Sequence, residues 1–508
     1  MLRRPVTAAL GLLCMLVPSG ARAADQWIEV GSAHFVVTSN ASQGSATTLA
    51  WQLEQIRSAI ATLWPWAHVD LNKPLAVFAV KDETAMKALA PVYWERKGGV
   101  HPASVWVGGP DQNYLAIRTD VPAPDTSEIN PYVTSYFSYV SLILAHSVEH
   151  ELPLWFSRGL SGVLSNTIIR NTKLLLGPPI PWHLTRLAQV PRLRLPLLLK
   201  VGSSSPEFTS DEGERTFDAE SWAFVHFLMF GEKGARWGKL DQFTKLVTSG
   251  TDPDAAFREA LGAPQDLEEP FFNYLGRNLF SYRQANIDVS VKREGFTVKP
   301  LGAADGASRR ALFHAAMGRS DEARAAIEEA RKAGPAPESF VAEAMLLDRA
   351  GKKDEAKAAY ASAVDAGSTS AYAYYRLASL LWQKNADRDT MTRVEGLFAK
   401  ATALNTRYAD AYASLGEVKS ILGTGEPMGL VLRAIALEPS EPYPRLAAAD
   451  VLWRARKYDE AVKYAESALS LAIDDETRRR AAETIDGLRC AKGGGELAPP
   501  NPASAKPN

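Results

Sequence analysis

The chain has 508 residues, of which 46% are hydrophobic and 23% are charged, a composition that suits soluble, folded domains. Its length exceeds one ordinary domain, so two or three domains are expected. The 57 basic and 58 acidic residues give a formal net charge of -1. No basic stripe with interleaved aromatic residues occurs, which argues against nucleic acid as a partner.

The first 23 residues have the pattern of a secretory signal peptide. Arg3 and Arg4 precede an apolar run, and residues 21–23 supply small side chains at the expected cleavage position. The run is too short to span a bilayer. We therefore expect an exported protein, periplasmic or secreted, with no membrane span. Its mature form keeps one cysteine, Cys490, so no intramolecular disulfide is expected and stability must come from packing.

The next part of the chain, residues 25–300, mixes strand and helix patterns. Alternating side chains predict two short strands within residues 27–40. Apolar residues at helical spacing then predict a helix that ends at Pro65. Later patterns predict a buried strand over residues 74–82, a helix over 84–95, a hairpin over 103–120, and helices near 131–149, 153–166, 217–231, 234–249, 252–262 and 266–284. The expected fold is α+β, with a small sheet before residue 166 and a helical lobe over residues 167–300.

The predicted hairpin turns at residues 108–111, which read Gly-Gly-Pro-Asp. Successive side chains of a strand point to opposite faces of the sheet. Its second strand therefore divides into two sets, with Tyr114, Ala116 and Arg118 on one face and Leu115, Ile117 and Thr119 on the other.

Residues 305–489 repeat at a period of about 34 residues, which is typical of tetratricopeptide (TPR) units. Aligning two units places Ala323 on Ala356, Ile327 on Tyr360, and Ala330 on Ala363. Small residues are needed where paired helices approach closely, and larger ones fill the space between pairs. We expect an all-α TPR solenoid of about five units, followed by a disordered tail at residues 490–508.

Residues 130–166, which include "NPYVTSYFSYVSLILAHSVEHELPLWFSRGLSG", resemble the active-site region of peptidase MA-like bacterial proteins. These are thermolysin-like (gluzincin) domains that are often fused to TPR repeats. The similarity extends in order over nearly all of residues 27–284, including "GGPDQNYLAIR" and "ESWAFVHFLMFGEKGAR". The resemblance implies a zincin-like fold for this domain.

In active members one helix carries H-E-x-x-H, and a Glu of the next helix completes the zinc site. The two His residues hold the metal, and the Glu between them takes a proton from the bound water. The resemblance puts Phe137 and Ser141 at the His positions, Ser138 at the catalytic Glu, and Arg158 at the third ligand. A shift of one residue restores none of them. The resemblance therefore implies a pseudopeptidase, not an enzyme, without a metal or other cofactor. We expect Arg158 to pair with an acidic neighbour.

An alternative metal site lies beside these positions. His146, Glu149 and His150 spell H-x-x-E-H, and a downstream carboxylate such as Glu220 could complete an inverted zincin site. A histidine at a helix end is also explained by the helix dipole. This alternative would make the protein a zinc metallopeptidase with a relocated site.

Two surfaces could bind protein or peptide partners. In gluzincins the substrate backbone adds to an exposed edge strand, and the resemblance places that strand at Asn113, Tyr114, Leu115, Ala116, Ile117 and Arg118. A loop could equally cover this edge. The second surface is the concave face of the TPR solenoid. The leading hypothesis is an exported scaffold or adaptor, although the first domain could also merely cap the repeats.

Overall fold

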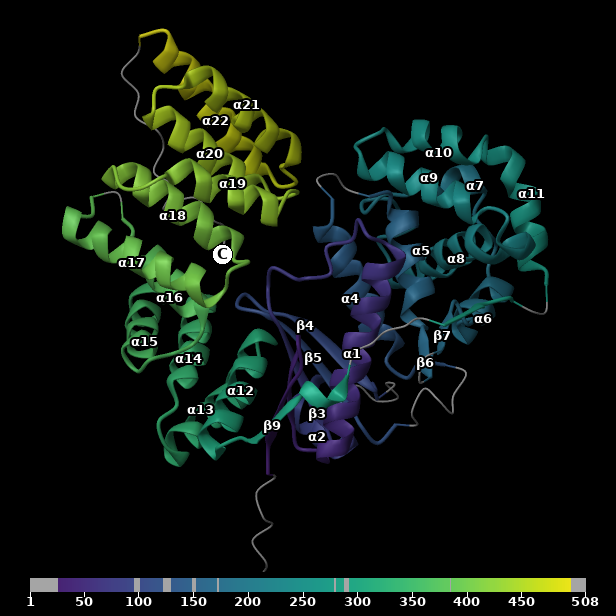
Figure 1. Cartoon of the computed structure of the whole chain (residues 1–508), viewed down its shortest axis with the longest axis horizontal. Helices are drawn as coiled ribbons and strands as arrows, with labels where there is room; N and C mark the ends of the chain where they lie inside the picture. Colours follow the sequence, from purple (N-terminus) through teal and green to yellow (C-terminus); the bar gives the residue numbers. More distant parts are fainter. Residues whose placement is uncertain are drawn as a thin grey trace, which may run out of the picture.

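The structure is a computed structural model with two lobes that lie side by side (Figure 1). The described residues are 26–95, 101–121, 129–148, 152–170, 173–277, 280–286, 292–383 and 385–494. The expected signal peptide, Glu149, His150 and most of the expected tail therefore lie outside the described residues. The first lobe holds the strands and helices up to β9, and the second lobe is a helical array.

A six-stranded sheet forms the centre of the first lobe, in the order β4-β5-β3-β2-β1-β9. Strands β2, β3 and β5 are parallel, whereas β4, β1 and β9 run antiparallel to their neighbours. The strands are β1 (Ile28–Gly31), β2 (Val36–Ser39), β3 (Leu75–Val80), β4 (Ser104–Gly108), β5 (Asn113–Arg118) and β9 (Thr297–Pro300).

The prediction that residues 113–118 form an exposed edge strand is wrong. This segment, β5, pairs along its length with β3 on one side and with β4 on the other. The tight turn over residues 108–111 folds β4 back onto β5, so the antiparallel strand takes the edge position instead. The side chains from Asn113 to Ile117 are buried. Strand β5 therefore has no unpaired edge for an added peptide.

Helices cover the sheet and build the rest of the first lobe. They are α1 (Gln43–Leu63), α2 (Glu83–Leu89), α3 (Val92–Glu95), α4 (Val133–His146), α5 (Leu154–Ser165), α6 (Pro181–Gln189), α7 (Leu195–Leu198), α8 (Asp211–Phe230), α9 (Trp237–Thr248), α10 (Pro253–Leu261) and α11 (Pro264–Leu275). Short 3-10 turns occupy Gly231–Gly234 and Arg293–Gly295.

A second sheet in this lobe was not predicted. It contains β6 (Ile168–Arg170), β7 (Lys173–Leu176) and β8 (Arg283–Asn286), in that order. The helix expected over residues 266–284 ends at Leu275, because its last part pairs with β7 as a strand. Cross-strand partners more than 100 residues away override the local helical pattern.

The second lobe consists of five antiparallel helix pairs and one further helix, α22. The helices are α12 (Ala303–Ala316), α13 (Ser320–Ala333), α14 (Pro337–Arg349), α15 (Lys353–Asp365), α16 (Ala371–Leu381), α17 (Arg388–Leu404), α18 (Ala409–Leu422), α19 (Pro427–Leu437), α20 (Pro442–Arg454), α21 (Tyr458–Leu471) and α22 (Asp475–Lys492). Each pair packs on the next, as in a TPR solenoid. The aligned residues Ala323 and Ala356 are fully buried.

The end of this array differs from the prediction. The tail was expected to begin at residue 490, but α22 continues to Lys492 and includes the exposed Cys490. Across the part of the chain that the structure describes, every helix is too short or too polar to cross a membrane.

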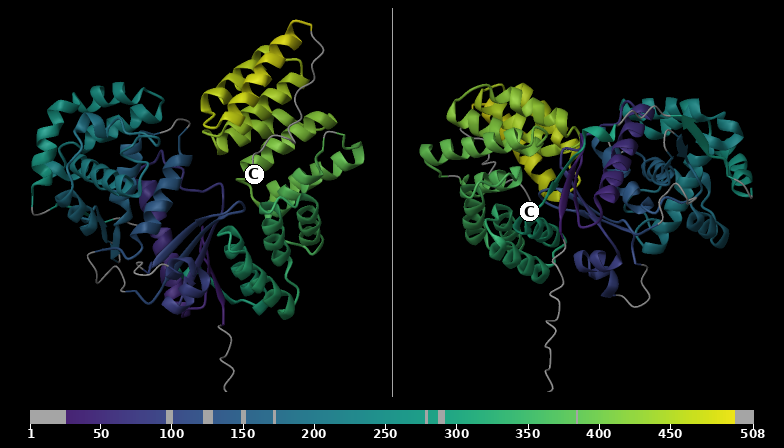
Figure 2. Two further views of the ribbon diagram at one scale, coloured as in Figure 1. Left: turned by 180° about the vertical axis from the view of Figure 1, so that it is seen from behind. Right: turned by 60° about the horizontal axis from the view of Figure 1, so that its bottom comes forward.

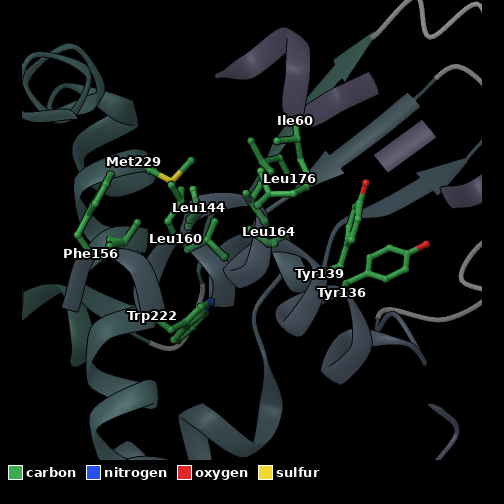
Figure 3. Close-up of a cluster of buried hydrophobic side chains, with 14 of the residues drawn as sticks. Ile60, Tyr136, Tyr139, Leu144, Phe156, Leu160, Leu164, Leu176, Trp222 and Met229 are labelled. Carbon is green, nitrogen blue, oxygen red and sulfur yellow. The ribbon is translucent and has the colours of Figure 1, made fainter. Parts of the chain in front are cut away.

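The sheet separates two hydrophobic cores. Val77, Ala79, Leu115 and Ile117 face the core that α1, α4, α5 and α8 complete; part of this core is drawn in Figure 3, where Leu144 and Leu160 lie between Trp222 and Met229. The alternate residues of β3 and β5 face the core of the first repeats. The strand alternation predicted from the hairpin is therefore confirmed, and both faces of the sheet are covered.

Phe313 of α12 joins the sheet to the array. Its ring contacts Phe78 of β3 and Tyr114 of β5 edge to face, with ring centroids 5.4 and 5.7 Å apart. Both views in Figure 2 show the array lying against the sheet. This aromatic cluster fixes the first repeat on the first lobe.

Truncation of this ring tests the junction. Phe313→Ala is expected to lower the free energy of unfolding by about 3–5 kcal/mol, since it leaves a cavity between the two lobes. Urea denaturation of the mature chain measures the loss. Tyr282→Ala, at a half-exposed aromatic ring, should change stability by less than about 1 kcal/mol. Equal losses in the two variants would contradict the role given to Phe313.

Candidate functional site

Phe137, Ser138, Ser141 and Arg158, the four positions that the sequence resemblance implies for a zinc site, lie on α4 and on the first half of α5, two helices that pack together. The Arg158 guanidinium lies over the Phe137 ring, 4.8 Å from its centroid. Ser141 Oγ donates to Ser161 Oγ of α5 at 2.9 Å. Ser138 Oγ instead donates to the Thr134 carbonyl of its own helix at 3.2 Å. The structure thus brings Phe137 to Arg158 and Ser141 to Ser161, whereas the Ser138 hydroxyl bonds within α4.

Arg158 forms an ion pair with two carboxylates of α8. Its Nε and Nη2 atoms donate to the two oxygens of Asp218 at 2.6 and 2.5 Å, and Nη2 also donates to Glu214 Oε1 at 2.7 Å. Burial raises the pKa of Asp218, Arg158 lowers it, and Glu214 raises it again, so that the net shift is upward. The acidic neighbours expected for Arg158 are therefore present, and they balance its charge.

The chemistry available at these positions is limited. A metal site needs several His, Cys or carboxylate ligands, and in the described ranges no three such residues are placed so that they could hold a metal ion together. The hydroxyls of Ser138 and Ser141 donate to a carbonyl and to another hydroxyl, and neither of these acceptors is a base. The arrangement provides packing and charge pairing rather than a nucleophile or a ligand set.

The residues of the alternative zinc site have separate surroundings. Burial lowers the pKa of His146, and the positive charge of Lys73 lowers it further. Glu220 Oε1 accepts the backbone N–H of Leu193 at 2.9 Å, and burial raises its pKa to about 7. A cation facing His146 opposes zinc binding. Glu149 and His150 lie outside the described residues.

A cavity of about 660 Å³ lies beside the aligned zinc positions; we call it the helix-side cavity. One wall comes from α4, α5 and the connection between them, and it includes Ser141, Ala145 and Arg158. The opposite wall comes from α20, the end of α21, α22 and the connections between them, and it includes Tyr443 and Arg480. The sequence did not predict this cavity, because it exists only where the two lobes face each other.

The wall formed by the repeats is backed by a buried carboxyl pair. Glu417 of α18 and Asp450 of α20 are 1% and 2% exposed, and the Tyr443 hydroxyl donates to Glu417 Oε2 at 2.7 Å. Burial raises the pKa of Glu417, and the charge of Asp450 raises it further. Arg480 lowers the pKa of both carboxyls. The charge of Arg480 is thus directed toward these acids.

A second cavity of about 430 Å³ lies between the sheet and the concave face of the array; we call it the sheet-side cavity. Phe78 and Tyr114 of the sheet line it, as do Tyr372 and Tyr408 of the repeats. The two cavities adjoin at the connection between α19 and α20, where Glu438 lines one and Glu441 lines the other.

The loop before β3 bridges the two lobes at this point. Asn72 Nδ2 donates to the Leu437 carbonyl at 2.5 Å, and Asn405 Nδ2 donates to the Asn72 carbonyl at 3.0 Å. These bonds join residues that are 365 and 333 positions apart. The bridging role of Asn72 could not be predicted from the sequence. An asparagine before a strand is the only local feature at this position, and asparagine is common in turns.

No family model matches the chain, and no curated protein matches it. Among solved structures, it is similar to YrrB, a TPR protein with an unusual peptide-binding site, at 15% identity over 35% of this chain and 92% of that chain, with a TM-score of 0.30. It is also similar to Pseudomonas aeruginosa pilF, at 16% identity over 37% of this chain and 91% of that chain, with a TM-score of 0.29. The similarity to yeast Tom70 has 12% identity over 58% of this chain and 66% of that chain, with a TM-score of 0.29. The TPR-like fold of the second lobe rests on its own helix pairs.

The ion pair of Arg158 is testable by substitution. Arg158→Met is expected to lower the free energy of unfolding by about 2–3 kcal/mol, because it leaves the Asp218 carboxylate without its partner. The ionised form of Asp218 carries this cost, so the loss should be smaller in acid than at neutral pH. Chemical denaturation at several pH values measures it.

Two further variants serve as controls. Arg324→Met removes an arginine from an exposed pair with Asp321 and should cost less than about 0.5 kcal/mol. Adding Asp218→Asn to Arg158→Met should recover part of the loss, because the unpaired charge disappears. A loss that does not depend on pH and is not recovered would show that Arg158 acts through packing alone.

Proposed function

We propose that this protein is an exported scaffold without peptidase activity, in which the two lobes together hold a segment of a partner protein. The observation that carries the proposal is the helix-side cavity, whose walls come from both lobes. Its first wall includes Ser141 and Arg158, two positions at which the resemblance places zinc ligands. The partner would thus occupy the place where a gluzincin binds its substrate.

The absence of peptidase activity follows from the residues at the aligned positions. Hydrolysis by a gluzincin requires a metal-bound water and a carboxylate base. Phe137 and Ser138 supply neither a ligand nor a base, and Arg158 brings a positive charge that two carboxylates already balance. We therefore propose a gluzincin-like lobe that has kept its helices and lost its chemistry. Export rests on the signal-peptide pattern of residues 1–23.

The character of the cavity suits recognition by apolar side chains. Leu144 and Leu152 line its first wall, and Leu446 and Ile473 line the second. Ile473 is 86% exposed, so its apolar surface remains in contact with water. Burial of a partner's apolar side chains here would remove this surface from water, at about 25 cal/mol per Å². A few such anchors supply most of the affinity of many interfaces.

Metal analysis tests the loss of catalysis. The purified mature protein is expected to hold no stoichiometric zinc after incubation with the metal, and to cleave no casein, because the aligned ligands are absent. Inductively coupled plasma mass spectrometry and a protease assay with and without chelator measure these properties.

The alternative peptidase makes the opposite predictions. It requires one zinc per chain that is lost in His146→Ala, and chelator-sensitive cleavage that is lost in Glu149→Gln. These two results together would refute the proposed function and show that the protein is a zinc peptidase with a relocated metal site.

Blocking the helix-side cavity tests the binding function. Ala145 is exposed and lines this cavity, so Ala145→Trp should fill it without disturbing the core. Panning a phage-displayed random dodecapeptide library on the full mature chain should enrich peptides whose affinity falls at least about tenfold in this variant. Fluorescence polarisation of the enriched peptides measures the change.

The control is Ala358→Trp on α15, an exposed alanine outside the lining of both cavities. It should bind the peptides as the wild type does. Peptides that bind Ala145→Trp unchanged would point to the repeats alone, with the first lobe as a cap.

A further inference from the structure

Three carboxyl groups line the two cavities. Asp111 belongs to the β4–β5 turn, whereas Glu438 and Glu441 belong to the α19–α20 connection. Burial raises the pKa of Asp111 to about 6 and that of Glu438 to about 7, and it raises the pKa of Glu441 as well. The positive charge of Lys73 lowers the pKa of all three, so this cation acts electrostatically on each carboxyl group.

Lys73 carries one positive charge against these three carboxyls. Its recorded hydrogen bond goes to the Gly109 carbonyl, at 3.2 Å. The other cation lining the sheet-side cavity, Arg309, pairs with Glu29 and donates to Thr38 Oγ1 at 2.7 Å. When all three acids are ionised, the group formed with Lys73 has two excess negative charges. Desolvated carboxylates in excess are costly unless a further cation approaches them.

Unsatisfied acceptors point to the same missing partner. Asn72 is 5% exposed and lines the sheet-side cavity. Its Nδ2 bonds the Leu437 carbonyl, but its Oδ1 has no hydrogen-bond partner among the described residues. Asp111 Oδ2 accepts the Tyr114 hydroxyl at 2.6 Å; Oδ1 makes no close hydrogen bond to a described residue, although the backbone N–H groups of Asp111 and Gln112 lower the pKa of this carboxyl. Buried acceptors without donors are rare, and an ammonium or guanidinium group supplies several donors together with positive charge.

We infer that the sheet-side cavity binds a lysine or arginine side chain of the partner segment, held by Asn72, Asp111 and Glu438. Apolar residues next to this cation in the partner enter the helix-side cavity. The inference rests on the proposed function and adds the chemical class of the ligand. Lys73 beside the carboxyls disfavours a metal ion, and the excess of acids disfavours a nucleic acid.

The composition of selected peptides tests the inference. The dodecapeptide library, panned on the full mature chain, should yield peptides enriched in lysine or arginine next to apolar residues. The double variant Asp111→Asn, Glu438→Gln should lose this basic enrichment. Asp321→Asn, which removes an exposed carboxylate of α13, should keep it.

One enriched peptide then provides a quantitative cycle. Replacing its basic residue by glutamine should weaken binding to the wild type at least about tenfold, and should change binding to the double variant by less than about threefold. The amide variants keep the shape of the carboxyls and remove buried charge. Their thermal midpoints should therefore equal or exceed that of the wild type, which separates lost recognition from unfolding.

The remaining outcomes overturn the inference in distinguishable ways. Selected peptides without an excess of basic residues would refute the cationic ligand and leave the proposed function standing. Basic enrichment that persists in the double variant would place the cation elsewhere. No enrichment of any peptide would refute both the proposed function and this inference.

Discussion

The contact of Phe313 with Phe78 and Tyr114 determines how the two lobes are placed. Both partners lie on one face of the central sheet, because strand side chains alternate, while their neighbours in β3 and β5 fill the opposite core. The sheet is thus a shared wall rather than the surface of one domain. The chain passes from β9 almost directly into α12, so little linker separates the lobes. The concave side of the array therefore faces the sheet, and both cavities result from this arrangement.

Contacts of Arg158 connect three helices of the first lobe. The Phe137 ring lies beneath the Arg158 guanidinium, and Asp218 and Glu214 of α8 balance its charge. One helical turn further along, the Ser141 hydroxyl of α4 donates a hydrogen bond to the Ser161 hydroxyl of α5. The ion pair and the ring contact join α4, α5 and α8, as a shared metal joins helices through its ligands.

Features set by local pattern could be predicted from the sequence. The strand alternation of β5, the helix before Pro65, the recurring alanines of the repeats and the acidic neighbours of Arg158 all follow from periodicity, residue chemistry or resemblance. The choice of Asp218 and Glu214 among many acids did not follow, because it depends on how α8 packs on α5.

Features set by distant pairing could not be predicted. The position of β5 inside the sheet depends on β4 and β3, and a strand's own sequence does not reveal how many neighbours it has. Strand β8 reads locally as helix until β7 is beside it. The bridge through Asn72 joins positions more than 300 residues apart, and the two cavities arise from the same long-range contacts.

The bridge through Asn72 has a mechanical consequence. The array contacts the first lobe at α12, and it is hydrogen-bonded to that lobe again near the ends of α17 and α19. Helices α20–α22 follow this second point of attachment in the chain. A solenoid curves through small rotations between successive repeats. A slight change in the packing of α18 against α20 would thus move the far wall of the helix-side cavity by an amount that grows along α20–α22. The width of the helix-side cavity therefore depends on the packing of α18, a helix that does not line this cavity.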